Sequence, residues 1–162
     1  MQAMTPPFPS MTHHLELRFE PDTDGTGELF ASARCENFSG AGSAWFHEWE
    51  VRAFGAKLQS CFPLLPGTEL RLEGGYWDSS CSPTRLKDVL MGIRIYPVGI
   101  TGEIGVRLEL GDGTYERQRP ESRGRASFEL MATYEDIQRF GAQIQLLVQP
   151  TGGTASLYRN AA

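Results

Sequence analysis

The chain of 162 residues has few cysteines. An odd number of cysteines does not form a closed set of disulfides, and these three are spaced too widely for a paired-cysteine metal or redox motif. They are Cys35, Cys61 and Cys81. We therefore expect free thiols and a reducing, cytoplasmic compartment.

Long apolar runs are also missing. No segment approaches the roughly 18 consecutive apolar residues that a membrane helix needs. The first residues, which include Pro6, Pro7 and Pro9, lack the basic region and apolar core of a secretory signal. We expect no membrane association and a flexible leader over residues 1–12, with Met1, Met4 and Met11 as alternative starts.

Positive charge is scarce, because 15 lysines and arginines stand against 20 acidic residues, for a net charge of −5. Nucleic acids require a basic stripe for affinity. The one cationic cluster, within residues 117–125, is interrupted by Glu116 and Glu121. We exclude nucleic acid as a partner, whereas the acidic balance is compatible with a basic protein partner.

Histidine is rare too, and His13, His14 and His47 do not have the spacing of metal ligands on a helix. His47 could act as a base for a serine or cysteine nucleophile, but a residue at the start of a helix is the simpler interpretation. We predict no catalytic residue, no metal ligand and no cofactor, so an enzyme is the less favoured reading.

What the sequence does contain is a repeat. Residues 50–59 (EVRAFGAKLQ) return 86 positions later as residues 136–145 (DIQRFGAQIQ), with four of ten positions identical. In both copies the apolar residues have the i, i+3, i+7 spacing of an amphipathic helix. We expect helices over about 47–60 and 134–149, and we interpret the repeat as an internal duplication. Chance resemblance between amphipathic helices is the alternative.

Alternating apolar and polar residues predict seven strands around these helices. The segments are 15–19, 29–35, 70–72, 89–95, 101–110, 126–130 and 155–157. Strands with one apolar face are typical of antiparallel sheets. The predicted fold is a single α+β domain over residues 13–162, in which one antiparallel sheet carries both helices on its apolar face.

Two short glycine-containing motifs have ordinary structural explanations. Asp22-Thr23-Asp24-Gly25 resembles the start of a calcium loop, but it lies between two strands and predicts a hairpin turn. Residues 40–43 (GAGS) resemble a phosphate loop, but the required glycine and lysine positions are not filled. We expect residues 37–44 to form a loop that leads into the first helix.

Aromatic residues give the clearest functional signal. On a helical wheel, Trp49 lies about 200° from Val51, so it cannot share the buried face of the first helix. An exposed tryptophan is typical of a binding surface, although a loop folded over it is the alternative. Tyr76, Trp77 and Tyr115 lie in predicted loops and are further candidates for partner binding.

Three segments carry a resemblance to a known group of proteins: residues 38–46 (FSGAGSAWF), 72–78 (LEGGYWD) and 96–106 (YPVGITGEIGV). They resemble small bacterial proteins of uncharacterised function. Some similar proteins lie beside polymorphic toxins as proposed immunity proteins. The resemblance implies a cytoplasmic, non-enzymatic, protein-binding role, and it brings no catalytic residues with it.

The sequence thus predicts a non-catalytic protein-interaction domain, immunity-like in character. The alternative is a small-molecule binding protein or hydrolase with a cleft near His47. A homodimer formed through an open sheet edge is a further expectation.

Overall fold

The computed structural model describes residues 12–113 and 119–160. The predicted leader lies outside the described residues, except for Thr12, which is the first residue of a strand. The elements in chain order are β1 (Thr12–Pro21), β2 (Thr26–Cys35), β3 (Phe38–His47), α1 (Glu48–Ser60), β4 (Leu70–Asp78), β5 (Arg85–Val98), β6 (Glu103–Gly111), the short 3₁₀ helix η1 (Pro120–Ser122), β7 (Arg125–Thr133), α2 (Tyr134–Leu147) and β8 (Ala155–Asn160).

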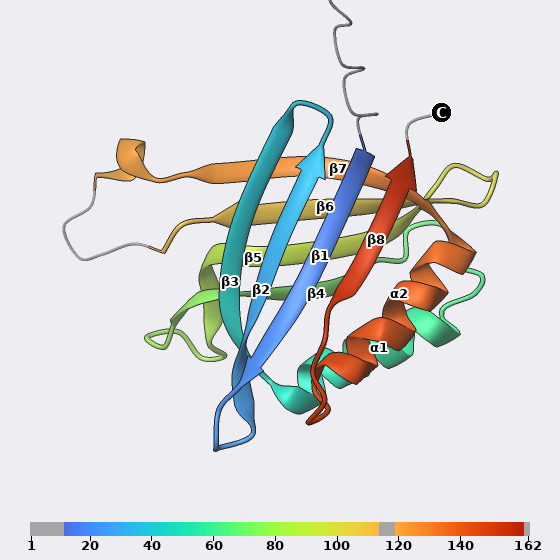
Figure 1. Ribbon diagram of the computed structural model, residues 1–162. Coiled ribbons are helices and arrows are strands. Elements are labelled where there is room, and N and C mark those ends of the chain that lie inside the picture. Colours follow the sequence, from blue (N-terminus) through green and yellow to red (C-terminus); the bar gives the residue numbers. More distant parts are fainter. Residues whose placement is uncertain (1–11, 114–118, 161–162) are drawn as a thin grey trace, which may run out of the picture.

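The strands form two four-stranded sheets. Sheet A has the order β3-β2-β1-β8, sheet B has the order β4-β5-β6-β7, and neighbouring strands are antiparallel. In Figure 1 the strands of sheet A run steeply across those of sheet B. The predicted α+β class is confirmed, but the strands are divided between two sheets instead of lying in one. Alternation shows which face of a strand is apolar, but it does not show which sheet the strand joins.

Strand β3 is absent from the prediction, which treated residues 37–44 as a loop. Its inward positions are occupied by small residues, Gly40, Gly42 and Ala44, so the segment lacks the apolar alternation that indicates a strand. These residues let β3 cross sheet B closely, because a Cβ atom on Gly42 would lie against the backbone oxygen of Leu90 and 3.1 Å from the backbone nitrogen of Gly111. The missing side chains therefore bring the two sheets together.

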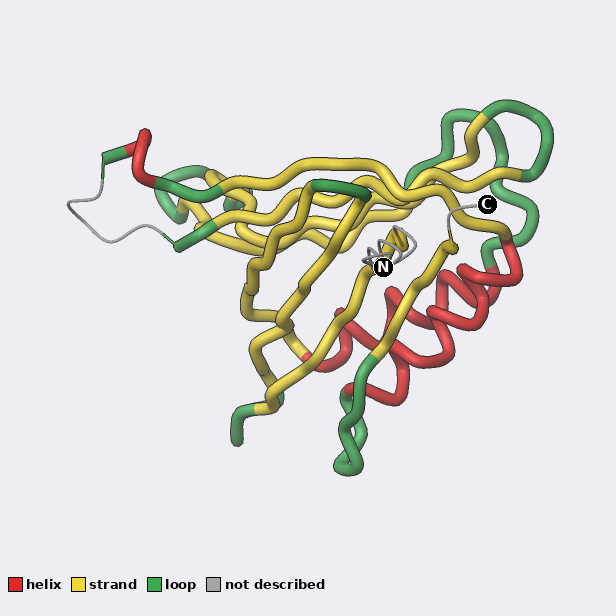
Figure 2. The backbone as a smooth tube through the Cα atoms, turned by 45° about the horizontal axis from the view of Figure 1, so that its top comes forward, coloured by secondary structure: helices red, strands yellow, loops and turns green. Residues whose placement is uncertain are grey.

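The helices have the predicted apolar stripes. Val51, Phe54 and Leu58 of α1 are buried, and Ile137, Phe140, Ile144 and Leu147 of α2 are buried in the same way. Figure 2 shows the two helices packed side by side. Helix α1 contacts β3 and β4, whereas α2 contacts β1, β7 and β8, so the helix pair bridges the two sheets.

The repeated glycines form the point of closest approach between the helices. A Cβ atom on Gly55 would lie 2.7 Å from the backbone oxygen of Gly141, and one on Gly141 would lie 2.6 Å from the backbone oxygen of Gly55. Beside them, the side-chain amide of Gln145 donates a hydrogen bond to that of Gln59, its equivalent in the repeat. The repeated residues therefore meet each other across the helix pair.

Each half of the chain has the same order of elements. Strands β1 to β3 are followed by α1 and β4, and strands β5 to β7 are followed by α2 and β8. In each half the strand after the helix joins the other half's sheet, because β4 pairs with β5 and β8 pairs with β1. This arrangement is compatible with an internal duplication, which itself stays a prediction.

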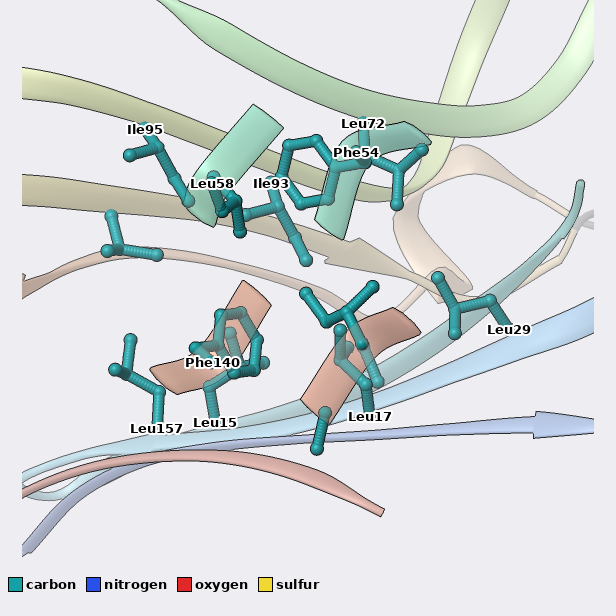
Figure 3. Packing of buried hydrophobic residues seen from close by; sticks show 14 of the residues in the cluster. Leu15, Leu17, Leu29, Phe54, Leu58, Leu72, Ile93, Ile95, Phe140 and Leu157 are labelled. Atoms are coloured by element: carbon teal, nitrogen blue, oxygen red, sulfur yellow. The ribbon is translucent and has the colours of Figure 1, made fainter. Parts of the chain in front are cut away.

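One cluster of buried side chains joins both sheets and both helices. Figure 3 shows leucines of sheet A and isoleucines of sheet B pointing toward each other, with Phe54, Leu58 and Phe140 of the helices in the same space. These residues are the inward members of alternating strand patterns and helix stripes. The core is therefore enclosed by three walls, which are the two sheets and the helix pair.

The turn between β1 and β2 is the predicted hairpin. The Asp24 carboxylate accepts hydrogen bonds from the backbone N–H (3.0 Å) and the hydroxyl (2.6 Å) of Thr26, and Gly25 has a positive φ of 83°. Asp24 uses its carboxylate to close the turn, as is common for aspartate in such positions. The backbone N–H of Glu48 donates to the Gly25 oxygen (2.9 Å), so this turn is fixed against the start of α1.

Helix α2 begins with the predicted cap. The Thr133 hydroxyl accepts a hydrogen bond from the backbone N–H of Asp136 (3.2 Å), and the Asp136 carboxylate accepts one from the backbone N–H of Thr133 (3.0 Å). Replacing Thr133 by alanine leaves one helical N–H without its side-chain partner. We expect Thr133→Ala to lower the free energy of unfolding by about 1 kcal/mol in urea denaturation. Thr133→Ser keeps the hydroxyl and serves as the control, so equal losses in the two variants would contradict the capping role.

Candidate functional site

All three tryptophans of the chain are exposed. Trp45 is 56% exposed, Trp49 is 63% exposed and Trp77 is 54% exposed. Tryptophan is among the largest apolar side chains, and in a folded protein it is usually buried to a large extent. The exposure of all three tryptophans is therefore unusual, and it marks the surface around them as a candidate binding site.

Different elements place these tryptophans. Trp45 lies on β3 opposite Glu28 of β2, on the side of sheet A that faces away from the core. Trp49 lies in the first turn of α1, off the buried stripe, and its ring stacks on that of His47 with centroids 6.1 Å apart. Trp77 lies near the end of β4, after register shifts at Gly74/Gly75 and Tyr76/Trp77 that turn this end of the strand.

Trp45 and Trp77 line a common hollow of about 380 Å³. His47 and Glu50, from the junction of β3 and α1, lie on its wall, and Thr26 and Thr84 complete the lining with Phe46. The Glu50 carboxylate accepts a hydrogen bond from the backbone N–H of His47 (2.8 Å), which holds both residues at the start of the helix. Trp49 is not part of the lining, but its ring stacks on that of His47, which is.

A larger groove of about 660 Å³ adjoins this hollow at Trp45, which lines both. The groove follows the outer face of sheet A and reaches the ends of β4 and β6. Tyr76, 41% exposed, lies on its wall opposite the sheet A residues. We call Trp45, Trp49, Tyr76 and Trp77, with the groove and the hollow between them, the tryptophan face.

The tryptophan face brings together three of the four residues that the sequence analysis selected. Trp49 is exposed, so no loop of the described chain covers it, whereas Trp77 lines the hollow and Tyr76 lines the groove. Tyr115 lies outside the described residues. Trp45 was not among the predicted residues, because residues 37–44 were expected to form a loop. Small residues occupy both faces of this part of β3, so no alternation of apolar and polar side chains indicated that Trp45 lies on a strand.

Acidic groups surround this face. Hydrogen bonds from the hydroxyl and backbone N–H of Thr26 hold the pKa of Asp24 below its usual value, and those of Ser80 lower the pKa of Asp78 in the same way. Asp24 interacts electrostatically with His47. Both carboxyl groups are therefore charged at neutral pH, and with Glu48 and Glu50 they give this end of the molecule a negative surface.

The groove carries carboxylates of its own. Glu28 accepts a hydrogen bond from the Ser43 hydroxyl (2.7 Å), and Asp112 accepts one from the backbone N–H of Gly124 (3.1 Å). Among the described residues, the cation in the lining is Arg18, which pairs with Glu20 and lies over the ring of Phe30 at 4.4 Å from its centroid. The groove therefore has negative charge in excess.

The thiols are not arranged for nucleophilic chemistry. Burial raises the pKa of Cys35, with Glu36 adding to the effect, and burial also raises the pKa of Cys61. A thiol is a strong nucleophile only as thiolate, which a raised pKa disfavours. The Sγ atoms of Cys35, Cys61 and Cys81 lie near Glu129, Leu58 and Asp78, and none of the three cysteines lines the hollow that contains His47.

The outer face of sheet B differs from the tryptophan face. Its charged side chains are paired with one another, because the Arg94 guanidinium contacts Glu69, Glu73 and Glu109. The Tyr96 hydroxyl donates to Glu129, and burial together with this hydrogen bond raises its pKa to about 12. These groups therefore stabilise one another.

Within residues 12–113 and 119–160, no group of three or more histidine, cysteine, aspartate or glutamate side chains is placed to hold a metal ion. The helices in this part of the chain are too short and too polar to cross a membrane. Comparisons with protein-family models, with curated proteins and with solved structures found no match for this chain.

Proposed function

We propose that the protein is a non-catalytic interaction domain that docks another protein on its tryptophan face. The observation that carries the proposal is the exposure of all three tryptophans, two of which line one hollow while the third stacks on His47 in the wall of that hollow. Tryptophan and tyrosine are enriched among the residues that contribute most to binding at protein interfaces. Here they lie on a strand, a helix and a strand end, which hold them in place before a partner arrives.

The resemblance of residues 38–46, 72–78 and 96–106 to small bacterial proteins, some of them proposed immunity proteins, favours an immunity-like role within this class. Immunity proteins act by binding a toxin, so a toxin domain encoded beside this gene is the first partner to test. The net charge of −5 suits a basic partner.

The geometry favours binding over hydrolysis. His47 and Glu50 share the hollow, but the Glu50 carboxylate bonds to the backbone of His47 and so caps the helix. A hydrolase needs a nucleophile within hydrogen-bond reach of its base. In the part of the chain that the structure describes, the lining of the hollow has no cysteine or serine, and its hydroxyl groups belong to Thr26 and Thr84.

The test compares a variant with Trp45, Trp49 and Trp77 all replaced by alanine against wild type. Both proteins are immobilised and exposed to an extract of the cells from which the gene comes, and bound proteins are quantified by mass spectrometry. We expect at least one protein partner to be retained by wild type and reduced roughly 30-fold or more by the variant, because hot-spot residues contribute about 2 kcal/mol or more each.

The matched control replaces three exposed apolar residues outside the tryptophan face, Phe38, Phe62 and Leu65, by alanine. This variant should bind the same partner as wild type. Unfolding curves should show that both triple variants stay folded, since exposed side chains contribute little to stability. Equal recovery of every bound protein by the tryptophan variant and wild type would contradict the proposed function.

A further inference from the structure

The tryptophan face has a second property besides its aromatic surface, which is its pattern of charge. Within residues 12–113 and 119–160, the linings of the groove and the hollow together contain four carboxylates, from Glu16, Glu28, Glu50 and Asp112, and one guanidinium, from Arg18. Arg18 is already engaged by Glu20 and by the ring of Phe30. The nearby Arg85 and Lys87 of β5 lie opposite Asp78 and beside it, and neither lines the groove or the hollow.

The carboxylates retain capacity for further donors. Glu28 uses Oε1 for Ser43, Glu50 uses Oε2 for the His47 backbone, and Asp112 uses Oδ2 for Gly124. In the described part of the chain, the other oxygen of each group has no protein partner. A carboxylate accepts several hydrogen bonds, and a bidentate arginine or a lysine ammonium supplies them with opposite charge.

The aromatic rings of the tryptophan face also favour a cationic ligand. A cation over the face of tryptophan is attracted by the ring, and arginine is the commonest such partner. The chain itself contains a contact of this kind in the groove, between Arg18 and the ring of Phe30. The hollow offers Trp45 and Trp77 with the carboxylate of Glu50 in one lining, which is the combination that a cationic side chain fits.

We infer that the tryptophan face binds an extended segment of its protein partner that carries arginine or lysine side chains, with one cation in the hollow between Trp45 and Trp77 and others along the groove. This inference rests on the proposed function and states the chemistry of the partner. The four carboxylates supply the charge, and the tryptophans supply the apolar and cation–π contacts.

The probe is a blocked eight-residue peptide of alternating arginine and glycine. Its control is the same peptide with citrulline, which has nearly the same shape and no charge, in place of arginine. Because the chain has three tryptophans, all near the site, their indole N–H signals in a ¹⁵N-labelled sample report binding directly. We expect the arginine peptide to shift the signals of Trp45 and Trp77 and to bind roughly tenfold more tightly than the citrulline peptide at low salt. Raising the salt concentration should weaken its binding.

Two variants test the named carboxylates. Glu28→Gln keeps an acceptor oxygen for Ser43, and Glu50→Gln keeps one for the His47 backbone, but each removes one negative charge. Each variant should bind the arginine peptide several-fold more weakly than wild type. Glu135→Gln removes the same charge from a side chain that is 86% exposed at the start of α2, and it should have no effect. Equal binding of the two peptides, or equal weakening by Glu135→Gln, would overturn the inference.

The two proposals can fail separately. If the tryptophan variant loses its protein partner but the wild-type protein binds the arginine and citrulline peptides equally well, the surface docks a protein without recognising cationic side chains. If the arginine peptide shifts the indole signals but the tryptophan variant keeps every partner, the surface recognises cations outside the proposed interaction.

Discussion

Replacing Phe140 by alanine is expected to lower the free energy of unfolding by about 4 kcal/mol. Phe140 is fully buried and is among the largest of the fully buried side chains in the described chain. It extends from α2 into the space between the two sheets, so its removal leaves a cavity between three walls of the core. Three rigid walls collapse poorly around a cavity, which places the loss near the upper end of the usual range.

Urea denaturation followed by circular dichroism measures this loss. The matched control is Phe38→Ala, which makes the same substitution at a side chain that is 73% exposed and should change the free energy of unfolding by less than about 0.5 kcal/mol. Similar losses for the two variants would mean that the space around Phe140 is not closely packed. Binding of the arginine peptide by the Phe140→Ala protein that remains folded should be unchanged, since Phe140 lines neither the groove nor the hollow.

Replacing Gly141 by alanine is expected to lower the free energy of unfolding by about 2 kcal/mol, even though alanine favours helices over glycine by roughly 1 kcal/mol. The added Cβ atom would lie 2.6 Å from the backbone oxygen of Gly55 and 2.7 Å from the Cβ of Leu58. Backbone atoms cannot rotate away as a side chain can, so α1 and α2 must move apart. This separation loosens the packing of both helices.

Gly55→Ala should have a similar effect, because its Cβ atom would meet the backbone oxygen of Gly141. The double variant should lose less than the sum of the two single losses, because one separation of the helices accommodates both methyl groups. Gln138→Ala, on the exposed side of α2, is the control and should stay within about 0.5 kcal/mol of wild type. If Gly141→Ala were as stable as this control, the result would contradict the close contact between the two helix backbones at Gly55 and Gly141.

Much of the fold could be predicted from local patterns. The apolar stripes of both helices, the Thr133 cap and seven of the strands follow from periodicity and hydrogen-bonding side chains that act over a few residues. The division into two sheets could not be predicted in this way. It depends on strand pairing between distant residues and on close contacts at Gly42, where an absent side chain gives no periodic signal.

The candidate site shows the same division. Helical geometry fixes the angle between Trp49 and the buried stripe of α1, so the sequence showed that Trp49 is not on that stripe. Whether a loop covers Trp49 could not be predicted, because that depends on the folded chain, in which the side chain is 63% exposed. The proximity of Trp45 and Trp77 could not be predicted, because it depends on how β3 and the end of β4 meet in space. The carboxylates of the groove come from β1, β2 and the end of β6, so their grouping appears only in the folded chain.

The pairing of β8 with β1 has a consequence for the order in which sheet A is assembled. The ribosome makes the first three strands of sheet A early, but their core side needs sheet B for cover, and the sheet is finished only when β8 arrives. The groove also needs residues near the end of β6. During synthesis, sheet A therefore stays incomplete until β8 pairs with β1, and the surface proposed to dock a partner stays incomplete until β6 has been made.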